Sequence, residues 1–161
     1  MDRCFPPVIR PDTRLLVLGS LPGAASLAAQ RYYAHPQNQF WRLIGEAIGR
    51  DLVPLAYENR LEALLDAGVG LWDTVAAATR DGSLDSAIRL HEASDLPALV
   101  ATLPKLRAIG FNGAKSAAIG RRQLGEASGL ALIDLPSSSP AYASLSFERK
   151  REAWLALAAY L

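Results

Sequence analysis

The stretch LLVLGSLPGAASLAAQRYYAHPQNQFW, residues 15–41, decides how the chain folds. It begins with an apolar run, Leu15 to Leu18, that is typical of a buried strand. It ends at Phe40 and Trp41, which begin an apolar repeat of helical spacing. Glycines, prolines, paired tyrosines and polar residues lie between the two. We therefore expect a strand, a long irregular loop and a helix, and such loops are where α/β proteins place their sites.

The rest of the chain continues this alternation of strands and helices. Short apolar runs predict strands over residues 15–19, 69–72, 108–111 and 131–135. Helical patterns cover residues 40–48, 61–68, 96–103, 114–124 and 147–161. Gly68 is the expected C-cap of the second helix, and Ser146 is the expected N-cap of the last. The predicted fold class is α/β, a three-layer α/β/α sandwich with a central, mainly parallel four-stranded sheet.

The composition predicts one soluble domain over residues 1–161. Half of the residues are hydrophobic and 20% are charged, which is enough for a proper core. The net charge of +1 excludes a strongly basic protein. Residues 13–45 and 97–125 nevertheless contain basic but no acidic side chains. This segregation is compatible with one basic face and a phosphate-bearing partner, or with ordinary solvated helix faces.

Several classes of site lose support from the sequence. Cys4 is the lone cysteine, which excludes an internal disulfide and a four-cysteine metal site. His35 and His91 are isolated, and GSLPG matches neither a P-loop nor a dinucleotide turn, so we expect no metal and no cofactor. A serine hydrolase using Ser137, Ser138 or Ser139 with His35 would lack the G-x-S-x-G elbow. No signal peptide or membrane helix is seen, which favours a cytoplasmic protein.

Three unusual segments directly follow predicted strands. They are GSLPG at residues 19–23, GFNG at residues 110–113 and LPSSSPA at residues 135–141. In a parallel sheet the carboxyl ends of the strands share one edge, so all three segments should line the same cleft.

These segments carry a resemblance to a known family. GSLPG, then YYAHPQNQFW, then LPSSSPA resemble the motifs of the uracil-DNA glycosylase superfamily, in the same order. Together they are most similar to the hypoxanthine (deoxyinosine) DNA glycosylase family within it. The resemblance implies a monofunctional, metal-independent DNA glycosylase of base excision repair. Such an enzyme flips a deaminated base, here hypoxanthine, out of double-stranded DNA and hydrolyses its N-glycosidic bond to leave an abasic site. It would act as a monomer, associated with the nucleoid when bound to DNA.

One departure from the superfamily pattern bears on the substrate. Members that excise uracil usually carry Asp or Asn two residues after the first-motif glycine, where this chain has Leu21. Leucine cannot orient a water molecule by hydrogen bonding. The hypoxanthine family shares this gap and is thought to use the asparagine of the His-Pro-x-Asn segment, which is Asn38 here. The resemblance therefore implies that Asn38 is catalytic, although Asn38 could also cap the following helix.

The resemblance also implies the remaining site residues. The expected base-binding residues are Gly19, Ser20, Leu21, Tyr33 and Asn112. The expected DNA-binding residues are His35, Ser137, Ser138, Ser139 and Tyr142, of which Tyr142 would act as a wedge.

Each of these roles has a structural alternative. Tyr32 and Tyr33 could anchor the loop, and Asn112 could form a turn before the next helix. His35 could bond to the loop itself, while Phe40 and Trp41 are expected in the core. Three alternative functions stay open: a mismatch-specific uracil/thymine-type glycosylase, a non-catalytic DNA-binding relative, and a small-molecule hydrolase.

Overall fold

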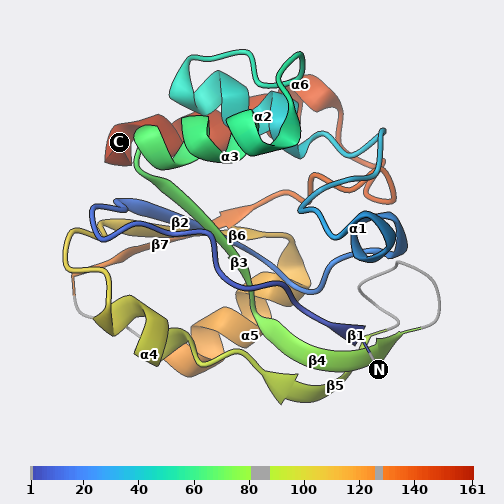
Figure 1. The fold of residues 1–161 in the computed structure, drawn as a ribbon, viewed down its shortest axis with the longest axis vertical. Helices are drawn as coiled ribbons and strands as arrows, with labels where there is room; N and C mark the ends of the chain where they lie inside the picture. Colours follow the sequence, from blue (N-terminus) through green and yellow to red (C-terminus); the bar gives the residue numbers. More distant parts are fainter. Residues whose placement is uncertain (1, 81–87, 126–128) are drawn as a thin grey trace.

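The centre of the protein is a parallel sheet, seen in a computed structural model that describes residues 2–80, 88–125 and 129–161 (Figure 1). The strand order is β3-β2-β6-β7, and each neighbouring pair is parallel. The strands are β2 (Leu15–Gly19), β3 (Val69–Asp73), β6 (Ala108–Asn112) and β7 (Ala131–Leu135). The predicted central four-stranded sheet is confirmed, and β3 and β6 are each one residue longer than predicted.

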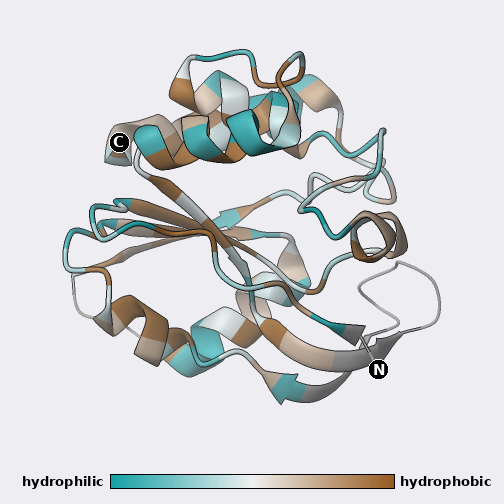
Figure 2. Cartoon of the chain, in the orientation of Figure 1, coloured by the Kyte–Doolittle hydropathy of each residue, from teal (hydrophilic) through white to brown (hydrophobic). Residues whose placement is uncertain are grey.

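Helices cover both faces of this sheet, so the predicted three layers are confirmed (Figure 1). One face carries α2 (Phe40–Ile48), α3 (Tyr57–Asp66) and α6 (Phe147–Leu155), and a 3-10 helix (Ala156–Tyr160) follows α6. The other face carries α4 (Leu96–Ala101) and α5 (Ala114–Leu124). Figure 2 shows the apolar residues gathered on the strands and the inner sides of the helices.

Strand β2 shows why the sequence folds this way. Its side chains alternate between the two layers, since Leu15 and Val17 pack with the first helix layer and Leu16 and Leu18 with the second. All four side chains are fully buried, which explains the unbroken apolar run in the sequence. The sheet therefore has two hydrophobic faces, and each one requires its own layer of helices.

The helix ends agree closely with the sequence signals. Ser146 accepts a hydrogen bond from the backbone N–H of Arg149 at 3.3 Å, which confirms it as the N-cap of α6. The C-cap of α3 is Ala67, and the predicted C-cap Gly68 is the next residue, with a φ of 88°. The cap thus lies one position earlier than predicted, and Gly68 follows it with a positive φ, which favours glycine at the end of a helix.

A second sheet was not predicted from the sequence. It is antiparallel, with the order β1-β4-β5, and comprises β1 (Asp2–Arg3), β4 (Val75–Arg80) and β5 (Ile88–Ala93). Strand β4 has the sequence VAAATR, whose three alanines give little strand propensity. The short helix α1 (Ala24–Ala29) was likewise missed inside the region predicted as loop. Tertiary contacts rather than local propensity place β4, whereas the alanine-rich sequence AASLAA of α1 itself favours a helix.

The register of the central sheet brings the carboxyl ends of its strands together. Gly19 at the end of β2 lies opposite Asp73 at the end of β3. Asn112 at the end of β6 lies opposite Leu135 at the end of β7. The residues after these positions leave the sheet at one edge, and this edge holds the candidate site.

Candidate functional site

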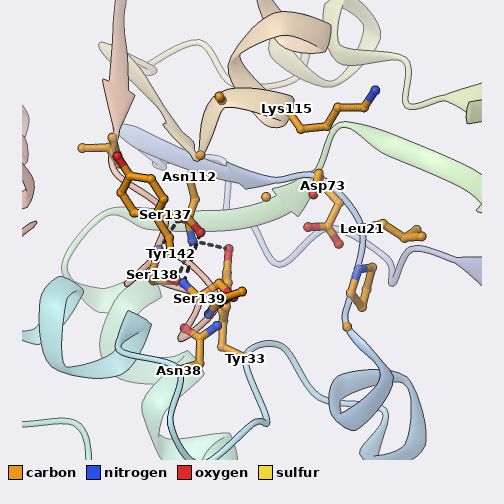
Figure 3. Close-up of a pocket in the computed structure, with 18 of the residues that line it drawn as sticks. Leu21, Tyr33, Asn38, Asp73, Asn112, Lys115, Ser137, Ser138, Ser139 and Tyr142 are labelled. Carbon is orange, nitrogen blue, oxygen red and sulfur yellow. Dashed lines mark hydrogen bonds between the residues drawn. The ribbon is translucent and has the colours of Figure 1, made fainter. Parts of the chain in front are cut away.

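A cavity of about 1300 Å³ opens at the carboxyl edge of the central sheet (Figure 3). The segments that follow β2, β6 and β7 all line it, as the sequence predicted. Its lining includes every residue proposed from the sequence: Gly19, Ser20, Leu21, Tyr33, His35, Asn38, Asn112, Ser137, Ser138, Ser139 and Tyr142. The cavity exceeds the size usual for a small-molecule site, which leaves room for more than one ring of a ligand.

Tyr33 forms a fixed aromatic wall of this cavity. Its ring stacks on Phe40 at a centroid distance of 3.8 Å and an interplanar angle of 12°. Its backbone carbonyl accepts a hydrogen bond from the indole N–H of Trp41 at 3.1 Å. Its φ is 53°, a left-handed conformation that costs energy in a non-glycine residue and is typical of functional sites. The ring is therefore held in place before any ligand binds.

Tyr32 has a different role from its neighbour. It is buried, and its hydroxyl donates a hydrogen bond to the carbonyl of Pro6 at 3.0 Å. Burial also raises the pKa of Tyr32 far above the usual value for tyrosine. Both tyrosines line the cavity, and Tyr32 in addition anchors the loop through its buried hydroxyl. Phe40 and Trp41 are buried in the core as predicted.

Asn38 lies one residue before Gln39, the N-cap of α2. Its Oδ1 accepts a hydrogen bond from the backbone N–H of Phe40 at 3.0 Å, while its own backbone N–H donates to the carbonyl of His35 at 3.0 Å. Asn38 is therefore not the N-cap itself, although its side chain satisfies the N–H of the first helical residue. The bond to Phe40 uses one lone pair of Oδ1 and fixes the amide, so a second lone pair and the NH₂ group remain for a ligand. This bond and ligand binding are compatible in this geometry.

Asn112 is tied to the loop that follows β7. Its Nδ2 donates to the Ser138 hydroxyl at 2.9 Å and to the Tyr33 hydroxyl at 3.4 Å. Its Oδ1 accepts the backbone N–H of Ser138 at 2.9 Å (Figure 3). Asn112 is 6% exposed. These bonds hold the end of β6, the serine loop and Tyr33 together, which makes Asn112 a structural tether, while its role in base recognition stays a prediction.

The serine loop, residues 137–139, splits into one buried and two accessible side chains. Ser138 is only 1% exposed, and its hydroxyl and N–H both bond to Asn112, which does not fit the DNA contact expected for it. Ser137 and Ser139 are half-buried and line the cavity. The hydroxyl oxygen of Ser137 accepts a hydrogen bond from the backbone N–H of Ser139, and that of Ser139 accepts one from the backbone N–H of Ala141. Their O–H protons are therefore directed away from these bonds and can be donated to an acceptor.

Asp73 is a site residue that the sequence analysis missed. It ends β3, is 4% exposed and lines the cavity. A Cβ atom on Gly19 would lie 2.6 Å from its Oδ1 and 3.1 Å from the Tyr33 hydroxyl, so Gly19 leaves the space that both groups occupy. Figure 3 shows the Asp73 carboxylate pointing into the cavity. Its signal in the sequence was an isolated acid at the end of an apolar run, VGLWD.

Leu21 forms part of the wall on the same side as Asp73 (Figure 3). It is buried against Val75 and Ile119 in a small apolar cluster, with Cys4 packed beside them. Burial, and then the nearby charge of Asp73, raise the pKa of the Cys4 thiol. Leu21 thus shapes the wall of the cavity and brings no hydrogen-bonding group to it.

The rim of the cavity carries exposed and basic side chains. Tyr142 is 42% exposed, and its backbone N–H donates to the carbonyl of Ser139 at 3.0 Å. His35 is exposed, and its Nδ1 accepts a hydrogen bond from the backbone N–H of Gln37 in the same loop. Lys115 and Arg121 also line the cavity from α5, and Arg121 pairs with Asp134 at 3.0 Å.

The described parts of the chain hold neither a metal-ion cluster nor a membrane-spanning helix. Over residues 2–80, 88–125 and 129–161, no three His, Cys, Asp or Glu side chains cluster as they would around a metal ion. None of the helices in these ranges is long and apolar enough to cross a membrane.

The fold and the cavity define an α/β protein whose sheet edge carries a cavity lined by a fixed tyrosine ring and by amide, carboxylate and hydroxyl groups. The family model of the uracil DNA glycosylase superfamily matches residues 6–158, and the chain belongs to this superfamily.

Individual relatives agree with this assignment. The chain is 43% identical over 152 residues to a protein of Methanosarcina acetivorans named hypoxanthine DNA glycosylase, with 94% of this chain and 95% of that protein covered. It is 47% identical over 112 residues to a protein of the same name from Methanosarcina barkeri, with 70% and 71% covered. The solution NMR structure of a candidate uracil DNA glycosylase from M. acetivorans superposes with a TM-score of 0.85, at 43% identity, covering 98% and 96% of the two chains.

Proposed function

We propose that this chain is a monofunctional DNA glycosylase that removes hypoxanthine from deoxyinosine in duplex DNA. The observation that carries the proposal is the meeting of Tyr33, Asn38 and Asp73 in one cavity, in a chain 43% identical to a hypoxanthine DNA glycosylase over nearly its whole length. The enzyme flips the nucleotide into the cavity, hydrolyses the N-glycosidic bond and leaves an abasic site. It works as a monomer in base excision repair and associates with the nucleoid through DNA.

Tyr33 serves as the platform for the flipped base. Stacking of a base on an aromatic ring contributes about 1–3 kcal/mol. One face of the Tyr33 ring is already covered by Phe40, and Tyr33 also lines the cavity. Because the ring is held by its neighbours, little conformational entropy is lost when the base binds.

Asp73 gives the cavity a way to recognise hypoxanthine. A carboxylate is acceptor-only when ionised, and hypoxanthine carries an N1–H donor on its Watson–Crick edge. Adenine has a lone pair at N1 in place of this hydrogen, so a carboxylate facing N1 favours the deaminated base. A buried acceptor left facing a second acceptor would cost about 1–3 kcal/mol, which is the scale of the discrimination expected.

Asn38 acts on the bond that is broken. Hydrolysis develops positive charge on the sugar and negative charge on the departing base, and fixed polar groups stabilise both. The free lone pair of Asn38 Oδ1 can accept a hydrogen bond from the attacking water, and its NH₂ group can donate to the base. The hydrogen bond from the Phe40 N–H orients this amide. Leu21 itself brings no water-orienting group to the cavity, and the proposal gives this task to Asn38.

The remaining contacts hold the DNA around the extruded nucleotide. Ser137 and Ser139 donate their hydroxyl protons to phosphate oxygens, and the exposed ring of His35 lies on the same rim. Tyr142 enters the space vacated by the base, which offsets part of the few kcal/mol spent on flipping. Gly19 and Ser20 shape the floor of the cavity beneath the base.

The proposal is tested with labelled duplexes that contain one inosine, uracil or xanthine, incubated without added metal and then cleaved with alkali at abasic sites. We expect breaks at inosine in amounts that match the release of free hypoxanthine. Breaks confined to uracil would replace the proposal with a uracil/thymine-type activity. Binding without breaks would indicate a non-catalytic relative, and absence of DNA binding would point to another substrate.

A matched pair of variants tests the assignment of Asn38. Asn38→Ala removes the proposed amide, and Gln37→Ala removes the exposed amide of the adjacent residue. Asn38→Ala should abolish most excision while circular dichroism stays that of the folded protein. Gln37→Ala should retain activity. Equal turnover by the two variants would remove Asn38 from the mechanism.

A further inference from the structure

Lys150 occupies an unusual position for a lysine. It lies on α6 and is only 2% exposed, whereas lysine is almost never fully buried unless it is paired. Among the described residues, no carboxylate lies within ion-pair distance of its ammonium group. Burial accordingly lowers its pKa from the usual value for lysine. A buried charge without a counter-ion costs several kcal/mol, which an apolar side chain of similar length would not incur.

The contacts of the ammonium group lie on segments that line the cavity. Its Nζ donates to the Gln39 side-chain oxygen at 3.1 Å and to the carbonyl of Ser139 at 3.5 Å. It also lies 5.3 Å from the centre of the Tyr142 ring, within cation–π distance. One buried charge therefore joins the start of α2, the serine loop and the rim.

The link to Gln39 matters because Gln39 is the residue after Asn38. The backbone N–H of Gln39 donates to the carbonyl of Ser138 at 2.9 Å, so the backbone of Gln39 is tied to the serine loop. Lys150 adds a second tie between the same two segments through the Gln39 side chain. Removing the ammonium group would leave one of these ties and free the Gln39 side chain.

We infer that Lys150 is a positioning residue for base excision, which sets the distance between Asn38 and the serine loop that grips the DNA. The inference rests on the proposed glycosylase function. Lys150 contacts no substrate itself and acts through Gln39 and Ser139. Misplacement of a reacting group by about 1 Å can cost about a hundredfold in rate, so a tie of this kind is large enough to matter.

The test measures single-turnover excision of hypoxanthine at saturating enzyme, well below the melting temperatures of the variants. Lys150→Met keeps the length of the side chain and removes the charge. Arg149→Met removes an equal charge from an exposed position on the same helix and serves as the control. We expect Lys150→Met to lower the saturated rate by about a hundredfold and Arg149→Met to leave it within about twofold.

Gln39→Leu provides a second variant that removes only the acceptor of Lys150. If Lys150 acts through Gln39, Gln39→Leu also slows the saturated rate, and the double variant is no slower than Lys150→Met, because coupled sites are not additive. A wild-type rate for Lys150→Met or for Gln39→Leu would overturn the inference. So would a double variant whose fold-decrease in rate equals the product of the two single decreases. Should Lys150→Met fail to fold, Gln39→Leu decides the matter alone. If the wild-type protein does not act on inosine, the proposed function fails and this role of Lys150 fails with it, whereas a wild-type rate in the variants of an active protein overturns the role of Lys150 alone.

Discussion

Replacing Asn112 by alanine tests the tether between β6 and the serine loop. Asn112→Ala removes the two bonds to Ser138, both 2.9 Å long, and the longer bond to the Tyr33 hydroxyl. Each good hydrogen bond contributes about 1 kcal/mol, and a buried donor left without a partner costs about 1–3 kcal/mol. Because Ser138 is 1% exposed, water cannot replace the lost acceptor. The expected loss is about 2–4 kcal/mol of unfolding free energy.

The assay is urea unfolding followed by circular dichroism, together with the melting temperature. A loss of this size lowers the melting temperature of a chain of this length by about 5–15 °C. Ser138→Ala removes only the hydroxyl and should cost about 1 kcal/mol. The double variant should cost less than the sum of the two, since the residues share their bonds.

A different role for Asn112 would give a different pattern. If Asn112 recognises the base and carries no structural bonds, Asn112→Ala stays within about 0.5 kcal/mol of the wild-type stability. Its affinity for an inosine duplex would then fall while its unfolding curve stays the same. That result would show that Asn112 does not hold β6 to the serine loop and would indicate that Asn112 recognises the base.

Three further perturbations test the cavity. Tyr33→Ala should weaken the binding of an abasic-analogue duplex in the presence of free base by about 1–3 kcal/mol, because the stacking contact is lost. Fluorescence anisotropy measures this affinity, and an unchanged value would indicate that Tyr33 only anchors the loop. Gly19→Ala would place a methyl group 2.6 Å from Asp73 Oδ1, so we expect about a hundredfold slower single-turnover excision, and a normal rate would show that the carboxylate can move without effect. Asp73→Asn removes a negative charge that raises the pKa of Cys4. Iodoacetamide should therefore alkylate Cys4 faster at pH 8 in this variant than in the wild type, whereas an equal rate would show that Asp73 carries no charge near Cys4.

The sequence predicted the central sheet and its helices because their signals are local. Strand β2 is an unbroken apolar run, and α2 carries an apolar repeat between Asn38 and Gly49. Both patterns arise from burial against neighbours that any α/β sandwich provides. The common edge reached by three loops followed from the parallel strand direction alone.

What the sequence did not reveal depends on contacts distant along the chain. Strand β4 is held by β1 and β5 rather than by its alanine-rich sequence. Asp73 is a site residue only because β3 pairs with β2 in the register that sets it opposite Gly19. The tether role of Asn112 likewise depends on Ser138, 26 positions away. Local propensity carries no information about such pairings.

The release of free hypoxanthine from an inosine duplex shows whether the protein excises this base and whether Asn38 is needed for it. It compares the wild-type protein with Asn38→Ala by chromatography of the free base under single-turnover conditions. We predict stoichiometric release by the wild type and a rate about 10²–10³-fold lower for the variant, the usual cost of removing one fixed polar group from an active site. Absence of hypoxanthine from the wild-type reaction, or equal rates for the two proteins, would contradict the account.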